Sequence, residues 1–126
     1  MRIAILLLST VLCICLGASK ASSFDEWSKQ DIALEAVSLG LIAVDWGQTR
    51  DIEARPKKFH EQQNIFLGRH PSEGAVNAYF ISYLIFHPAI TYILPKKYRP
   101  WFQAITIGIE TQAVIHNYSI GLNLRF

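Results

Sequence analysis

The sequence predicts an all-α protein in which three hydrophobic helices form a small bundle that is embedded in a membrane or associated with one. Two observations support this fold class. Apolar runs occupy residues 27–52, 75–94 and 100–117, and links containing proline, glycine and charged residues separate them. Within these runs the polar residues recur three, four or seven positions apart, a spacing that places side chains on one face of a helix.

The first 21 residues have the composition of a signal peptide. Arg2 supplies a positive start, residues 3–17 form an apolar run, and Ala21 is a small residue at the expected cleavage position. An apolar run of this length is short for a spanning helix, so an uncleaved anchor is the alternative.

Removal of residues 1–21 leaves one helical domain, at residues 22–126. Cys13 and Cys15, the two cysteines of the chain, lie in the removed segment. We therefore expect the mature domain to lack disulfides, thiolate metal ligands and a cysteine nucleophile.

The first predicted helix covers residues 27–52. Glu35 and Asp45 are the charged residues between positions 32 and 47, and most of the other residues there are apolar. A helix of this length can cross a bilayer, for which ~20 residues suffice. A polar segment with several basic residues follows and is expected to form a surface loop.

The second and third helices are predicted at residues 75–94 and 100–117. Both are apolar enough in the sequence to suggest membrane spans, and Pro88 is expected to bend the second because proline removes a backbone donor. Residues 118–126 alternate apolar and polar side chains, which predicts a short strand or an extended tail.

The charge pattern excludes nucleic acid as a partner. The formal net charge is only +2, and the lysines and arginines are dispersed along the chain instead of forming a basic stripe. The sequence also lacks a glycine-rich phosphate loop, a nucleophile elbow and a zinc-ribbon pattern. We accordingly expect no cofactor and no metal site, and nothing in the pattern indicates an enzyme.

Each predicted helix carries a polar stripe. If lipid surrounds the bundle, the stripes should be buried against one another, because ionisable groups that face hydrocarbon are costly. A soluble bundle would turn the same stripes toward water. The stripes consist of Asp31, Glu35, Ser38, Asp45 and Thr49 with Gln48 beside them, of Asn77 and His87, and of Gln103, Thr106, Glu110 and Asn117.

The buried stripes permit two interpretations. Asp45, Gln48, His87 and Glu110 either hydrogen-bond between helices as structural contacts, or they form a site that binds a divalent cation or relays protons. The spacing of the residues does not decide between these interpretations.

The loop after the first helix holds a second polar cluster. We expect Glu61, Asn64 and His70 to fold back over the end of the first helix, near Asp45, Gln48 and Thr49, because the apolar residues 65–67 need cover. His60, Glu61 and His70 are residue types that bind metals, but their spacing is not that of a zinc-hydrolase motif.

Four segments together resemble a family of small proteins found in proteobacteria and their phages. They are Asp45-Trp46-Gly47-Gln48-Thr49-Arg50, Glu61 with Asn64, Leu67-Gly68-Arg69-His70-Pro71-Ser72, and Val76-Asn77-Ala78-Tyr79-Phe80. The resemblance covers residues 27–121. It implies a class of protein and a bacterial or phage-encoded source, without implying a reaction.

These observations favour a small membrane protein of the cell envelope with a structural or interaction role. Its expected location is the inner membrane or the periplasmic side of the envelope, and its expected partners are the lipid bilayer and a protein partner or a second copy of the chain. Two alternatives stay open: a membrane-embedded binding or metal-dependent catalytic protein with a site around Asp45, Glu61 and His70, and a soluble periplasmic bundle. The candidate binding residues are Asp45, Gln48, Thr49, Glu61, Asn64, His70, Asn77, His87 and Glu110.

Overall fold

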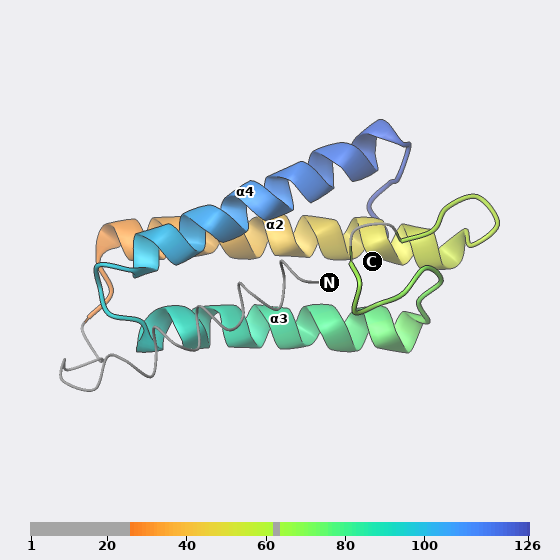
Figure 1. The fold of residues 1–126 in the computed structure, drawn as a ribbon. Coiled ribbons are helices and arrows are strands. Elements are labelled where there is room, and N and C mark those ends of the chain that lie inside the picture. Colours follow the sequence, from red (N-terminus) through yellow and green to blue (C-terminus); the bar gives the residue numbers. More distant parts are fainter. Residues whose placement is uncertain (1–25, 62–63) are drawn as a thin grey trace.

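The computed structural model describes residues 26–61 and 64–126, and the predicted signal peptide lies outside this range. The described chain forms three helices, α2 (Lys29–Ala54), α3 (Glu73–Ile93) and α4 (Arg99–Ser119), and contains no strand (Figure 1). The prediction of an all-α fold with three helices is therefore confirmed.

Local sequence signals explain where the helices begin. Ser28 and Asp31 form a capping box at the start of α2, in which each side chain accepts a hydrogen bond from the backbone of the other. Ser72 caps α3 by accepting a hydrogen bond from the backbone N–H of Ala75 at 3.2 Å. Pro100 lies in the first turn of α4, where its missing N–H has no helical partner to lose.

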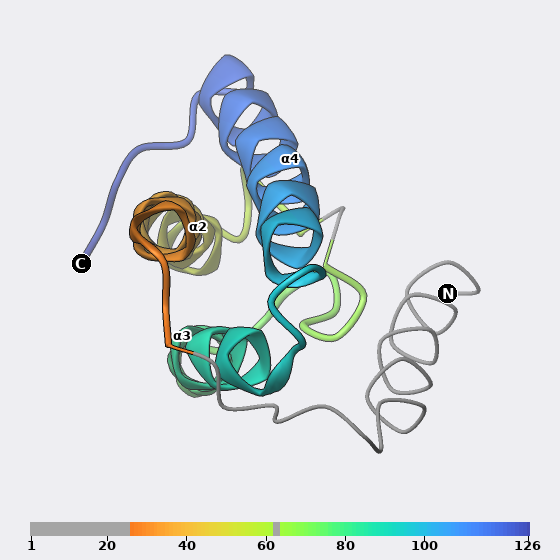
Figure 2. The same ribbon diagram turned by 90° about the vertical axis from the view of Figure 1, so that its left-hand side faces the viewer.

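Helix α2 makes most of the contacts between the helices. It packs against both α3 and α4, which contact each other little. Figure 1 shows α4 diverging from α3 toward its C-terminal end, and Figure 2 shows the three helices at the corners of a triangle. The loop that joins α2 to α3 occupies the wide end of this arrangement (Figure 1). The helices thus lie closer together at one end of the bundle than at the other, where the loop is located.

The interior of the bundle is unusually polar. Its main apolar cluster consists of Ile42, Val76 and Phe80, and a smaller one joins Ile52, Phe59 and Leu122. The polar stripes of α2 and α4 point inward, as expected for a bundle with an apolar exterior. The buried polar side chains are those of Asp31, Glu35, Ser38, Gln48, Thr49, Asp51, His87, Thr91, Arg99, Gln103, Thr106, Glu110 and Asn117.

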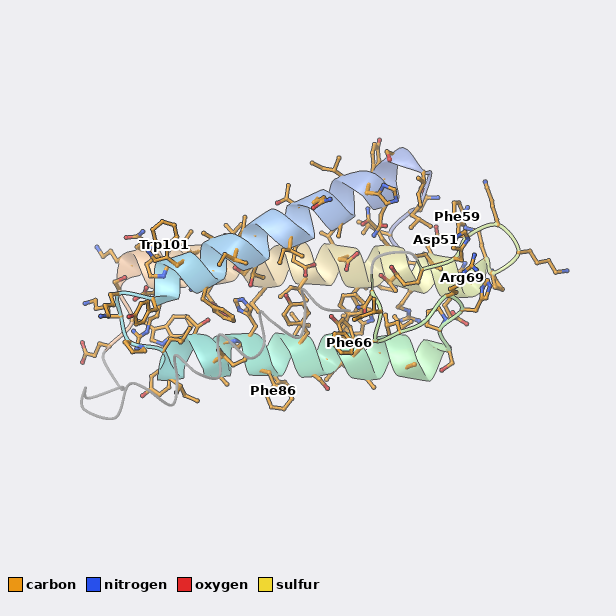
Figure 3. The ribbon with its side chains drawn as sticks, viewed as in Figure 1. Asp51, Phe59, Phe66, Arg69, Phe86 and Trp101 are labelled. Atoms are coloured by element: carbon orange, nitrogen blue, oxygen red, sulfur yellow. The ribbon has the colours of Figure 1, made fainter. Side chains whose placement is uncertain are left out.

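Large apolar side chains lie on the outside instead. Trp101 is 72% exposed, Ile115 is 63% exposed and Phe86 is 62% exposed. Figure 3 shows Trp101 and Phe86 projecting away from the helices that carry them. Polar residues inside and apolar residues outside are the reverse of the usual arrangement in water.

The expectation of membrane-spanning helices is not supported. Across residues 26–61 and 64–126, no helix combines the length and the apolarity that crossing a bilayer requires. Polar residues such as Glu35 and Glu110 recur along α2 and α4 and reduce the apolarity of both helices.

The C-terminal tail differs from a strand. Helix α4 extends to Ser119, the chain turns at Gly121 with a positive φ of 89°, and the following residues are irregular. The backbone N–H of Arg125 donates to the carbonyl of Gly47 at 3.0 Å, so the tail returns to α2. The strand alternative for residues 118–126 is wrong, because the tail packs on a helix and meets no second strand in the described chain. Pro88, which is expected to bend the second helix, lies inside α3, and the helix continues past it to Ile93.

Candidate functional site

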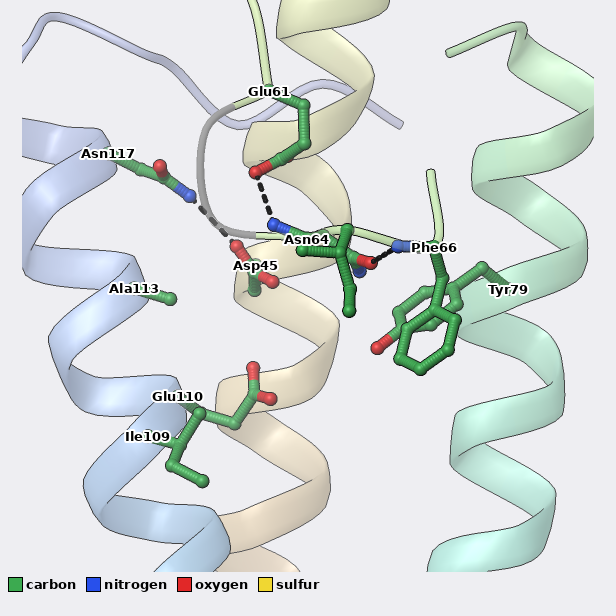
Figure 4. Close-up of a pocket in the computed structure, with 10 residues that line it drawn as sticks. Asp45, Glu61, Asn64, Phe66, Tyr79, Ile109, Glu110, Ala113 and Asn117 are labelled. Carbon is green, nitrogen blue, oxygen red and sulfur yellow. Dashed lines mark hydrogen bonds between the residues drawn. The ribbon is translucent and has the colours of Figure 1, made fainter. Parts of the chain in front are cut away.

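A pocket of about 230 Å³ lies between α2, α4 and the loop that follows α2 (Figure 4). It lies at the end of the bundle where α4 diverges from α3 (Figure 1). Its polar lining residues come from these three regions and from α3, and are Asp45, Glu61, Asn64, Tyr79, Glu110 and Asn117.

A short chain of hydrogen bonds holds the loop side of the pocket in place. The Glu61 carboxylate accepts a hydrogen bond from the backbone N–H of Asn64 at 3.0 Å, and the Asn64 side-chain oxygen accepts one from the backbone N–H of Phe66 at 3.0 Å (Figure 4). The backbone N–H of Glu61 donates to the carbonyl of Arg69 at 2.9 Å. Side chains that cap their own loop in this way restrict its backbone.

Helices α2 and α4 supply the opposite wall. The Asn117 amide donates to the Asp45 carboxylate at 2.8 Å, which joins the two helices (Figure 4). Glu110 lies two turns before Asn117 on the same face of α4, so its carboxylate lines the same pocket. The pocket therefore gathers three carboxylates, one each from α2, α4 and the loop.

Burial raises the pKa values of the two carboxyl groups that the helices supply. Burial and then repulsion from Glu110 and Glu61 raise the pKa of Asp45 to about 7, against the opposing effect of the Asn117 hydrogen bond. Burial also raises the pKa of Glu110, although a hydrogen bond from Tyr83 and the proximity of His87 lower it in part. Asp45 thus exchanges its proton near neutral pH, as acid–base or cation-binding carboxyls do.

Aromatic side chains form the third wall. The rings of Phe66 and Tyr79 stack with centroids 6.5 Å apart, and Tyr79 meets Tyr83 edge to face at 6.0 Å. Burial raises the pKa of the Tyr79 phenol, so this residue stays neutral. The pocket combines negative charge with flat apolar surfaces.

A second polar cluster lies inside the bundle and is centred on His87. Its imidazole bonds Glu35 on α2 through Nδ1 at 2.7 Å and Thr106 on α4 through Nε2 at 2.9 Å. Thr91 and Gln103 donate further hydrogen bonds to Glu35, at 3.0 and 2.8 Å. Burial acts to raise the pKa of Glu35, but these hydrogen bonds outweigh it, and the pKa is lowered. The cluster therefore joins all three helices around an ionised carboxylate.

Arg99 closes the narrow end of the bundle. Its fully buried guanidinium donates to the carbonyls of Leu94 at 2.9 Å and Tyr92 at 3.0 Å and lies 3.7 Å from the Asp31 carboxylate. The planar fork of arginine suits several acceptors at once, so this residue fixes the connection between α3 and α4.

The structure brings together only some of the residues expected to form a site. Asp45, Glu61, Asn64 and Glu110 line the pocket. Gln48 instead donates to the carbonyl of Val114 at 3.3 Å and borders a separate apolar groove.

The other candidates have separate surroundings. Thr49 is buried but does not line the pocket, and Asn77 accepts a hydrogen bond from the Trp46 indole at 3.0 Å. His70 is exposed on the loop, with its ring 6.4 Å from that of His60, and does not line the pocket. His87 belongs to the cluster with Glu35.

Sequence reasoning missed two polar lining residues, Asn117 and Tyr79, and one buried carboxylate, Glu35, as site members. Asn117 and Glu35 lie on the polar stripes, so their spacing was a usable signal, and Tyr79 belongs to one of the segments that carry the family resemblance. In the described ranges, no group of three histidine, aspartate or glutamate side chains is placed to hold a metal ion. Comparisons of the chain with protein-family models, with curated proteins and with solved structures find no match.

Proposed function

We propose that the protein is a membrane-associated component of the bacterial cell envelope, with a structural or interaction role. The observation that carries this proposal is the reversed distribution of polarity between the interior and the surface. The stripes of α2 and α4 are buried against one another, while Trp101, Phe86 and Ile115 are more than half exposed. A soluble bundle with the same sequence would place its stripes in water.

The energetics favour an apolar environment for this surface. Each Å² of apolar area removed from water contributes about 25 cal/mol, so the outward side chains of α3 and α4 gain several kcal/mol when lipid covers them. The inward polar groups are mostly hydrogen-bonded to one another across the helices. Interhelical hydrogen bonds of this kind hold bundles together where lipid removes the hydrophobic drive for association.

One end of the bundle has the composition of a membrane interface. Tyr92, Tyr98 and Trp101 are 42%, 37% and 72% exposed there, and Lys96 and Lys97 are exposed between them. The Lys97 ammonium lies 4.8 Å above the Tyr98 ring. Aromatic residues prefer the headgroup level, and lysines attract anionic lipid. This end is the expected contact with headgroups, with no helix required to cross the bilayer.

Vesicle flotation tests the proposal. The full chain, purified in detergent, is mixed with vesicles of phosphatidylcholine and phosphatidylglycerol, freed of detergent and centrifuged in a density gradient. We expect the protein to float with the vesicles. A variant with Ile81→Ser, Ile85→Ser and Phe86→Ser removes three exposed apolar side chains of α3 and should lower the floating fraction at least tenfold.

A second triple variant provides the control. Lys29→Ser, Gln30→Ser and Gln112→Ser change exposed polar positions, so flotation should persist. Circular dichroism should show equal helix content in both variants. A wild-type protein that stays monomeric in detergent-free buffer and ignores the vesicles would overturn the proposal. So would a defined oligomer that ignores them, because copies of the chain would then cover the apolar surface.

A further inference from the structure

One oxygen in the pocket wall lacks a partner although it is buried. Glu110 is only 5% exposed, and its Oε2 atom has no hydrogen-bond partner. Figure 4 shows the carboxylate extending from α4 toward α2, on the side of α4 that faces the pocket. Buried carboxylate oxygens are normally hydrogen-bonded or paired, since an unpaired one is costly. This oxygen is therefore placed to accept a hydrogen bond from a ligand, since no donor of the protein bonds it.

Two further carboxyl groups lie in the same pocket. Asp45 on α2 and Glu61 on the loop line it, and the lining residues that the structure describes include no lysine, arginine or histidine, although His87 is near enough to lower the pKa of Glu110 in part. Asp45 accepts a hydrogen bond from Asn117, and Glu61 accepts one from the Asn64 backbone, but both of these donors are neutral. The described lining thus gathers three acidic side chains around the unpartnered oxygen of Glu110.

The remaining walls are apolar and suit a carbon chain. Phe66 and Tyr79 present stacked rings, and Ile109 and Ala113 lie on the α4 side. Aromatic faces attract organic cations as well as alkyl groups. A bare metal ion would need several oxygens converging on one point, which the described carboxylates do not provide.

From these features we infer that the pocket binds an organic ammonium ion, with its charged head at Glu110 and Asp45 and a short apolar stem against Phe66 and Tyr79. An ammonium group carries N–H donors that can supply the missing partner of Glu110 Oε2 and reach Asp45 at the same time. The inference rests on the pocket alone and does not depend on whether lipid covers the outer surface.

Calorimetric titration with small probes tests this inference. The full chain in nonionic detergent is titrated at pH 8 with n-butylammonium chloride, with butan-1-ol as the neutral analogue and with sodium butyrate as the anionic analogue. We expect saturable binding of the ammonium ion only. Glu110→Gln and Asp45→Asn should each weaken it at least tenfold, whereas Glu53→Gln, a carboxylate of α2 outside the pocket, should leave it unchanged.

A steric variant keeps the test independent of charge. Ala113→Phe places a large ring in the lining and leaves all three carboxylates intact, so it should abolish binding while circular dichroism and denaturation midpoint stay close to the wild type. Absence of ammonium binding to the folded wild type would overturn the inference. Equal binding of butan-1-ol, or preferential binding of calcium or manganese chloride titrated alone, would overturn it as well.

Discussion

The imidazole of His87 on α3 lies 2.7 Å from the carboxylate of Glu35 on α2, although 52 residues separate them in the chain. Thr106 on α4 bonds the other ring nitrogen, so one fully buried side chain connects the three helices. These two hydrogen bonds hold the three helices together in a part of the bundle that has few apolar contacts.

Loss of His87 should destabilise the fold strongly. His87→Ala leaves the ionised Glu35 buried without its main partner and creates a cavity beside Phe102, whose ring stacks on the imidazole at 4.7 Å. Removing one member of a buried pair costs about 3–5 kcal/mol. Denaturant unfolding followed by circular dichroism measures the change. His70→Ala, at an exposed loop histidine, is the control and should change stability by less than about 0.5 kcal/mol. Equal stability of the two variants would contradict the proposed role of His87.

Asp45 should make stability depend on pH. Its pKa rises from 3.8 to about 7 on folding, so the folded state binds more protons than the unfolded state between these values. Stability from this group therefore falls as the pH rises from about 4 to 7 and is constant above that range. The groups that face Asp45 are Glu110 and Asn117 from α4 and Glu61 from the loop.

Asp45→Asn removes this penalty and keeps an oxygen that can accept the hydrogen bond from Asn117. At pH 8 the variant should exceed the wild type in unfolding free energy by on the order of 4 kcal/mol, since the pKa rises from 3.8 to about 7 and each pKa unit corresponds to ~1.4 kcal/mol. The difference should shrink toward zero as the pH approaches 4. Glu35 contributes with the opposite sign, because its lowered pKa stabilises the fold above about pH 4 and this stabilisation is lost on acidification. Both proteins contain Glu35, so comparing them at each pH cancels its contribution. A difference in unfolding free energy that does not vary with pH would contradict the raised pKa of Asp45.

Two glycines of α2 should respond differently to alanine. A Cβ at Gly47 would lie 2.8 Å from the Phe126 ring, so Gly47→Ala must displace the C-terminal tail. Phe126 also meets Trp46 edge to face, with ring centroids 6.5 Å apart, and a change in tryptophan fluorescence should report the displacement.

Gly40→Ala is the matched control, because nothing lies within 4 Å of the added Cβ. It should leave the fluorescence unchanged and stabilise the helix by about 0.5–1 kcal/mol through its higher helix propensity. An unchanged emission of Trp46 in Gly47→Ala would contradict the packing of the Phe126 ring against Gly47 and Trp46.

The sequence allowed the helices and their inward faces to be predicted, because both follow from local periodicity. Asp31 and Glu35 on α2 and Gln103 and Glu110 on α4 repeat at helical spacing, and all are buried. The resemblance to a proteobacterial and phage family stays a prediction, since no comparison tests it.

The contacts between distant elements could not be predicted in the same way. The pairing of Glu35 with His87 and the placement of Tyr79 in the pocket depend on how the helices rotate against one another, which a single sequence does not encode locally. The loop was expected to return to Asp45 with His70, but Glu61 and Asn64 line the pocket with Asp45 while His70 is exposed. The alternation in the tail suggested a strand because its long-range packing on Gly47 was not apparent from the pattern.

Quenching of tryptophan by brominated lipid tests the membrane association of the apolar surface most directly. Trp101 is 72% exposed at the end of the bundle expected to meet headgroups. Vesicles that contain brominated phosphatidylcholine should quench the emission of the wild-type protein, and Trp101→Phe should remove most of that quenching while Trp27 and Trp46 continue to emit. Emission that brominated lipid leaves unchanged, or that it quenches equally in both proteins, would contradict the account.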